Sequence, residues 1–290
     1  MLDDHEANLI GVSYDEDDEQ PFIDFKISLQ YPIARGPFER LVKSDALPPW
    51  IRNICKNRFI KNCQPYFAFT GRFGQYTEER ESSPVISKRF NPKLFFRLKR
   101  NGKSYLDVEY GHESNGQRVT TGESYTATAN ELENEDNGNR DYANDYISRG
   151  WDYVGITWHY RPIENDFLYT ANYANYIGGF LQGTVEEYYD WEERRPITSR
   201  DEVSGIKLLV KKKNTWRYSK SKTLKFNTTF VVETGTHRPF EYLSYRYELL
   251  IKILGMPMVA WARHGYNSDL ALYYKRVNSY GLAFEFRTFE

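Results

Sequence analysis

Two side chains that could carry out nucleophilic catalysis lie two positions apart in this sequence. His112 and Ser114 belong to residues 110–116, which read Tyr-Gly-His-Glu-Ser-Asn-Gly. Residues two apart in a β-strand project from the same face. The spacing could therefore bring the imidazole within hydrogen-bonding reach of the hydroxyl, which is the pairing that activates a serine nucleophile.

The face that carries these two side chains is apolar. Leu106, Val108 and Tyr110 share the parity of His112, and Asp152 in the next strand segment shares the parity of Val154, Ile156 and Trp158. Polar groups that face hydrocarbon are energetically expensive, which indicates a function for them. The alternative is an ordinary serine and histidine at a membrane boundary where water is available, and the pattern leaves both interpretations open.

The elements that would position these residues are amphipathic strands. From Phe22 onward, apolar and polar residues alternate with period two. About twelve such segments of roughly ten residues are present, which is the length of a tilted membrane-crossing strand. Because charged residues recur on the opposite face, the pattern predicts an all-β, antiparallel, up-and-down transmembrane barrel of about 12 strands, closed so that no backbone edge is unpaired. The clearest apolar sets are Ile23, Phe25, Ile27, Leu29 and Tyr31; Leu94, Phe96 and Leu98; Val154, Ile156, Trp158 and Tyr160; Leu243, Tyr245, Tyr247, Leu249 and Ile251; and Leu282, Phe284 and Phe286.

Composition agrees with this expectation and excludes other classes. The chain has 290 residues and a net charge of -1, from 39 basic and 40 acidic side chains, so it lacks the basic excess of nucleic-acid binders. Mean hydropathy is low, at -0.71, yet 17% of the residues are aromatic. This combination suggests a sheet with one wet and one apolar face bordered by aromatic rings. No apolar run of roughly 18 residues is present, which excludes transmembrane helices.

The connections alternate between short and long, as in outer-membrane barrels. Residues 101–103 and 163–166 read as tight turns, whereas 76–91, 117–147 and 187–204 are long and polar. We expect residues 1–20 to form an N-terminal segment with the first strand, and 21–290 to form a single barrel domain with a long loop at 117–147. The acidic stretches 15–19 and 131–145 read as solvated loops, with weak divalent-ion binding as the alternative.

One connection on the short side departs from this pattern. Residues 47–61 predict a basic amphipathic helix, which could lie on lipid phosphates or cap the barrel mouth. Cys55 and Cys63, the only cysteines, could form a disulfide or remain free thiols. No Cys and His cluster has the spacing of a zinc site. The N-terminus lacks a basic-then-apolar signal peptide, so export would require a signal that precedes this sequence.

The polar stretches around the two candidate residues resemble a known family. His112 to Gly116, and Ser148 to Asp152 (Ser-Arg-Gly-Trp-Asp), are similar to the His-x-Ser-Asn-Gly and Ser-Arg-Ser-Trp-Asn signatures of outer-membrane phospholipase A. The resemblance covers roughly residues 5 to 290 and is specific only around these stretches. Weaker matches surround them at 25–32, 81–84, 91–95 and 265–270.

The resemblance implies a twelve-stranded barrel in the outer membrane of Gram-negative bacteria that hydrolyses acyl ester bonds of glycerophospholipids. It implies Ser114 as the nucleophile, His112 as the general base and Asp152 as the residue that orients the imidazole. The backbone N–H of Gly116 would donate to the oxyanion. The family is active as a calcium-dependent homodimer on membrane phospholipids, with the acyl chain along the dimer interface. The calcium ligands would be the Ser148 hydroxyl, the Gln117 carbonyl and Ser82 of the partner subunit.

Three departures from the family pattern stand out. Asp152 occupies the position of an Asn, Gly150 replaces a Ser, and residues 117–147 replace a short loop. The last departure could cover the site or separate Ser148 from Gln117. An alternative function is therefore a catalytically silent outer-membrane barrel with a structural or adhesive role. A small pore is disfavoured because a twelve-stranded barrel with many long charged inward side chains fills its own interior.

Overall fold

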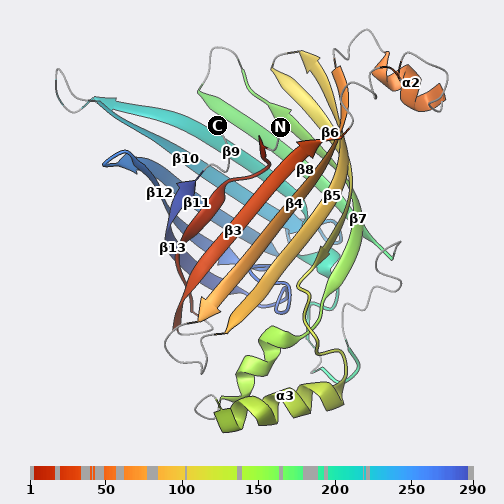
Figure 1. Ribbon diagram of the computed structural model, residues 1–290, viewed down its shortest axis with the longest axis vertical. Coiled ribbons are helices and arrows are strands. Elements are labelled where there is room, and N and C mark those ends of the chain that lie inside the picture. The colour runs from red at the N-terminus through yellow and green to blue at the C-terminus, as the bar shows by residue number, and fades with distance from the viewer. Residues whose placement is uncertain are drawn as a thin grey trace.

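The computed structural model of the chain is a closed antiparallel β-barrel (Figure 1). It describes residues 3–16, 20–33, 40, 42, 49–56, 62–76, 84–101, 103–135, 139–162, 166–178, 189–192, 195–217, 219 and 223–286. Strands β2 to β13 pair in chain order, and β13 pairs with β2 to close the ring. The barrel of about 12 strands expected from the sequence is thereby confirmed. The two-residue β1 (Asp3–Asp4) pairs with β3 beside β2.

The ring of strands has the following bounds. It consists of β2 (Asn8–Asp15), β3 (Gln20–Pro32), β4 (Asn62–Tyr76), β5 (Val85–Asn101), β6 (Ser104–Ser114), β7 (Gly150–Tyr160), β8 (Phe167–Ile177), β9 (Gly205–Arg217), β10 (Thr223–Gly235), β11 (Leu243–Ile253), β12 (Met256–Gly265) and β13 (Val277–Phe286).

The alternation in the sequence becomes two chemically different walls. The outward wall exposes large apolar side chains such as Leu94, Val108, Ile156 and Leu282. The inward wall carries charges, which are paired because an isolated charge away from water is costly. Described pairs on the inward wall are Asp24–Arg72, Lys93–Glu109, Arg97–Asp107, Lys207–Glu233 and Arg246–Glu248. An apolar outside and a polar, paired inside are what a barrel in lipid requires.

Apart from the connection that carries α2, the short connections lie at one end of the barrel and the long ones at the other. In Figure 1, α2 (Pro49–Cys55) lies at one end and α3 (Gly122–Glu135) at the other. α2 falls inside the expected 47–61 helix, of which residues 47–48 and 57–61 lie outside the described part. Cys55 and Cys63 form a disulfide with Cα atoms 5.3 Å apart, which settles the alternative that the sequence left open. None of the described helices is long and apolar enough to cross a membrane.

Residues 117–147, expected as a long loop, contain helical structure. α3 starts with a reciprocal cap, in which Thr121 Oγ1 accepts from the Ser124 N–H and Ser124 Oγ accepts from the Thr121 N–H. The 3₁₀-helix η1 (Arg140–Tyr146) follows, and Ala143 packs against Ala129 and Leu132 of α3. The sequence analysis did not predict these helices. The acidic composition is typical of a solvated loop, and few apolar residues mark the face that α3 and η1 bury against each other.

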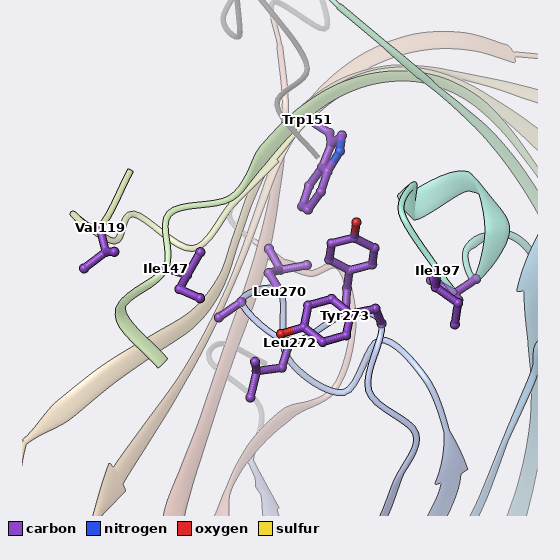
Figure 2. Packing of buried hydrophobic residues seen from close by; sticks show 10 residues of the cluster. Val119, Ile147, Trp151, Ile197, Leu270, Leu272 and Tyr273 are labelled. Atoms are coloured by element: carbon purple, nitrogen blue, oxygen red, sulfur yellow. The ribbon is translucent and has the colours of Figure 1, made fainter. Parts of the chain in front are cut away.

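The connection between β12 and β13 folds back into the barrel. Residues 266–276, here called the plug, bury Leu270, Ala271 and Tyr273 almost completely. Figure 2 shows Tyr273 lying under Trp151, with Ile197 on one side and Val119 and Ile147 on the other. Inward-facing cations fix the plug: Lys88 pairs with Asp269, Arg72 donates to the Ser268 carbonyl, and Arg89 donates to Asn267. This filled interior argues against a pore.

Replacing Tyr273 by alanine should lower the unfolding free energy by about 3–5 kcal/mol, because a buried ring is lost together with its contacts. The ring is 1% exposed, meets Trp151 edge-on at 5.5 Å, and its hydroxyl donates to the Thr198 carbonyl. Urea unfolding of the barrel in lipid vesicles measures the change. The control Phe240→Ala removes an aromatic ring that is 69% exposed and should shift stability by less than about 0.5 kcal/mol. Equal effects of the two substitutions would contradict a packed plug.

Candidate active site

The pairing of β6 with β7 places two of the predicted site residues face to face. His112 is the direct cross-strand neighbour of Asp152, and Ser114 is that of Gly150. Val108 and Val154 lie on the same outward wall and are about two-fifths exposed. The strand parity inferred from the sequence therefore corresponds to the outer face of the barrel.

Each carboxylate oxygen of Asp152 makes a hydrogen bond to a side chain of β6. His112 Nδ1 lies 2.8 Å from Asp152 Oδ1, and the Tyr110 hydroxyl donates to Oδ2 at 3.0 Å. Asp152 is 0% exposed, so both bonds form in a site shielded from water, where they offset the cost of a buried carboxylate. With a proton on Nδ1 directed at Asp152, Nε2 keeps its lone pair, which is the tautomer that a general base needs.

Tyr110 is a site residue that the sequence analysis did not assign. It was placed on the outward face only as an apolar neighbour of His112, yet its hydroxyl donates to the Asp152 carboxylate. The signal was present in the sequence, since Tyr110, His112 and Ser114 share one parity. A tyrosine whose ring faces lipid still needs a partner for its hydroxyl.

Ser114 lies two residues beyond His112 on the same half-buried wall. Within the described residues, no hydrogen bond joins the Ser114 hydroxyl to the His112 ring. Catalytic hydrogen bonds are often long in unliganded enzymes and tighten only when substrate binds. The structure thus brings His112 and Asp152 into contact and places Ser114 next to them by strand register.

The backbone at His112 has an unusual support from the inside of the barrel. Lys93 pairs with Gly111 and Phe90 with Ser114, so Pro92 falls opposite His112 in the β5–β6 pairing. Proline has no N–H to give to the neighbouring strand. The side-chain amide of Asn91 replaces it and donates to the His112 carbonyl at 3.1 Å. The same amide group is bound to the Tyr153 hydroxyl at 3.0 Å, which fixes its orientation.

Asn115, which follows the candidate nucleophile, ties the ends of β6 and β7 together. Its N–H donates to the Arg149 carbonyl at 3.1 Å, its Oδ1 accepts from the Arg149 N–H at 2.9 Å, and its Nδ2 donates to the Ile147 carbonyl at 2.7 Å. Asn115 is 0% exposed. These bonds fix the path of the chain on either side of Ser114 and explain why an asparagine suits this position.

Gly116 adopts a backbone conformation that favours glycine. Its φ is +63°, and an added Cβ would lie 3.1 Å from the Phe90 ring. A side chain here would therefore be both strained and crowded. The residue is exposed, so its backbone is accessible from outside, as an oxyanion donor must be.

The two ends of the 117–147 insertion are joined at its base. Val119 and Ile147 form a parallel bridge, and the Ser148 N–H donates to the Val119 carbonyl at 2.8 Å. The insertion therefore closes on itself, and Gln117 and Ser148 each lie within two residues of this bridge in the chain. A hydroxyl and a backbone carbonyl are donors that fit calcium. Ser82 lies outside the described residues. Among the residues described, no group of three or more His, Cys, Asp or Glu could hold a metal ion.

The barrel is similar to solved structures of outer membrane phospholipase A. The Escherichia coli protein superimposes with a TM-score of 0.60 over 100% of both chains, at 14% identity. The Salmonella typhi protein, solved as a dimer with bound calcium, gives a TM-score of 0.60 over 98% of this chain and 91% of that one, also at 14% identity. No family model and no curated protein matches the sequence. At this identity the likeness shows the fold, a closed twelve-stranded barrel that matches outer-membrane proteins of Gram-negative bacteria.

Proposed function

We propose that the protein is an outer-membrane phospholipase A that hydrolyses acyl ester bonds of glycerophospholipids. The observation that carries the proposal is the 2.8 Å contact between His112 and Asp152 on the lipid-facing wall, with Ser114 two residues further along. A shielded carboxylate–imidazole pair beside a serine is the arrangement that activates a hydroxyl nucleophile. The likeness in fold supports the same class of substrate.

In this reaction Ser114 Oγ attacks the ester carbonyl carbon while His112 Nε2 takes the hydroxyl proton. Asp152 stabilises the imidazolium that forms, and the Gly116 N–H stabilises the oxyanion. Collapse of the tetrahedral intermediate breaks the ester C–O bond, and His112 returns the proton to the leaving lysophospholipid oxygen. Water, deprotonated by His112, then releases the fatty acid and restores Ser114.

The position of the site suits a bilayer substrate. It lies at the ends of β6 and β7 that face the long connections, and the same wall continues along β6 and β7 with the exposed side chains Val108, Val154 and Ile156. An ester carbonyl of a phospholipid lies between the polar head group and the acyl chains. The site would thus meet the ester while the acyl chain follows the apolar wall, and a second copy of the chain in a homodimer would cover that acyl chain.

Calcium would be bound by the Gln117 carbonyl and the Ser148 hydroxyl, with Ser82 of the partner subunit, and would supply positive charge next to the oxyanion. Because these donors are uncharged, we expect weak binding, with half-maximal activity at roughly 0.1–1 mM calcium or above. Titrating calcium into chelated protein while fatty-acid release is followed measures this. Release that is unaffected by chelator would keep the esterase and contradict the metal site.

The proposal is tested with refolded protein and a fluorophosphonate probe that labels activated serines, alongside fatty-acid release from mixed micelles. Labelling confined to the peptide that contains Ser114, together with release, supports the phospholipase. A folded dimer that neither labels nor releases fatty acid would leave the silent structural or adhesive barrel as the function.

A further inference from the structure

Two buried ion pairs lie behind the site, on the inner side of β6 and β7. Arg149 Nη2 lies 2.7 Å from Glu192 Oε2, with side chains 0% and 1% exposed. Arg200 Nη2 lies 2.5 Å from Glu113 Oε2, and the Arg200 side chain is 1% exposed. Both pairs join the strands that carry the site to residues 189–204, which belong to the β8–β9 connection. Within 189–204, all residues but 193–194 are described.

The first pair holds the segment that precedes Asp152. Glu192 accepts the Tyr189 N–H with its second carboxylate oxygen, at 3.1 Å. The Tyr189 hydroxyl donates to the Ser148 carbonyl at 3.1 Å, and the Arg149 guanidinium lies 5.3 Å from the Tyr189 ring centre. The Arg149 carbonyl in turn accepts the N–H of Asn115, directly after Ser114, and the Arg149 N–H donates to Asn115 Oδ1. A shift of Glu192 would therefore be transmitted to both strand ends.

The second pair holds the strand between the base and the nucleophile. Glu113 lies between His112 and Ser114, and its side chain points to the opposite face. Its carboxylate meets Arg200 and also Arg89, whose Nε is 3.0 Å from Oε1. Arg200 lies 4.5 Å from the Trp151 ring centre, and Trp151 is both the cross-strand neighbour of Glu113 and the residue before Asp152.

Residues 198–204 are well fixed and can act as a support. Glu202 Oε1 accepts the N–H groups of Thr198 and Ser199 at 3.0 and 3.1 Å. The plug contacts the same stretch, since the Tyr273 hydroxyl donates to the Thr198 carbonyl at 3.0 Å. Arg200 is therefore anchored from the barrel interior rather than carried on a free loop.

We propose that Glu192 and Arg200 are positioning residues, which set the spacing between Ser114, Gly116 and Asp152 from inside the barrel. Neither residue touches the substrate, which approaches from the outer wall. This inference rests on the proposed hydrolysis at Ser114. A displacement of about 1 Å at a catalytic group can cost on the order of 10²-fold in rate, so small movements of either strand end would be visible in catalysis.

Buried ion pairs could also act only by stabilising the fold. A second ion pair of β6, away from the site, serves as the control that separates this role from positioning. Asp107 faces inward from the same strand and pairs with Arg97 at 2.8 Å, with side chains 3% and 12% exposed. It lies five residues from His112 and has no described contact with residues 189–204. Asp107→Asn removes a comparable buried charge without disturbing the support behind the site.

The experiment compares Glu192→Gln, Arg200→Lys and Asp107→Asn with the unmodified full chain, each refolded and checked for the folded barrel by heat-modifiable gel mobility. The fluorophosphonate labelling rate and the kcat and KM for a micellar phospholipid are measured. We expect Glu192→Gln and Arg200→Lys to lower kcat and the labelling rate by about 10²-fold with KM within about twofold, because the outer binding wall is unchanged. Asp107→Asn should leave both rates within about twofold of the unmodified chain.

The outcomes separate this inference from the proposed function. If the unmodified chain labels but Glu192→Gln and Arg200→Lys label equally fast, the positioning role is overturned and the hydrolase stands. A loss as large in Asp107→Asn would also overturn it, because any missing inward charge would then suffice. Absence of labelling in the unmodified folded chain would overturn the proposed function itself. Should Glu192→Gln fail to fold, Arg200→Lys, which keeps the positive charge, decides.

Discussion

Replacing Ser114 by alanine is expected to lower fatty-acid release from mixed micelles by at least about 10³-fold, because Ser114 is the hydroxyl of β6 that lies next to His112 and would form the acyl-enzyme. Ser114 is half-buried, and alanine removes only its hydroxyl. The barrel should therefore keep its stability within about 0.5 kcal/mol. Release rates and the covalent label on the Ser114 peptide, detected by mass spectrometry, measure the effect.

The matched control is Ser104→Ala, because Ser104 begins the same strand and shares the parity of Ser114. It pairs with Tyr160 at the far end of β7, away from His112. The control should retain the activity of the unmodified chain. Activity that survives Ser114→Ala, or that disappears equally in Ser104→Ala, would show that the reaction does not pass through Ser114.

The barrel and the facing of its residues could be predicted from the sequence because both depend on local alternation. Period two assigns each residue of a strand to one wall, so His112 and Asp152 could be placed outside before any pairing was known. Their direct opposition could not be predicted. It depends on the register of β6 against β7, two strands that are separated in the chain by the 35 residues from Asn115 to Arg149. The Asn115 bonds to Ile147 and Arg149 help to fix this register.

Features that depend on long-range packing were not predictable from pattern. Residues 265–270 could be matched to a family segment, yet the sequence did not show that Leu270 and Tyr273 pack inward with Trp151 and Ile197. The ion pair of Glu113 could not be predicted, because its partner Arg200 lies 87 residues later in the sequence. Asn91 and Pro92 could be matched to a family segment, but their support of the His112 carbonyl depends on which residue Pro92 faces. Such contacts require the folded barrel.

Substitutions of Asp152 are expected to give the second large loss of activity, and the size of the loss depends on the residue that replaces it. Asp152→Ala removes the acceptor for His112 Nδ1 and should lower activity by about 10³–10⁴-fold, as loss of the orienting residue does in serine hydrolases. Asp152→Asn keeps an acceptor oxygen at the same place and should cost only about tenfold, since it loses the charge that stabilises the imidazolium but retains the orientation. Activity in micelles at saturating calcium measures both variants.

Tyr110 makes the difference between these two variants testable. Its hydroxyl donates to the carboxylate in the native chain, and because a phenol can also accept, it can satisfy the amide N–H that Asp152→Asn introduces. Tyr110→Phe should therefore lower activity less in the native chain than in the Asp152→Asn variant. In the native chain one carboxylate oxygen loses a donor, but the bond to His112 remains. Combined with Asp152→Asn, Tyr110→Phe should lower activity further, because the shielded amide then loses the Tyr110 oxygen as an acceptor and more readily turns its N–H₂ toward His112. If both variants kept the activity of the native chain, the contact with His112 would not orient the base, and the outer-wall site would work through Ser114 and His112 alone. An equally large loss in both would show instead that the charge of Asp152, rather than its acceptor oxygen, is what the base needs.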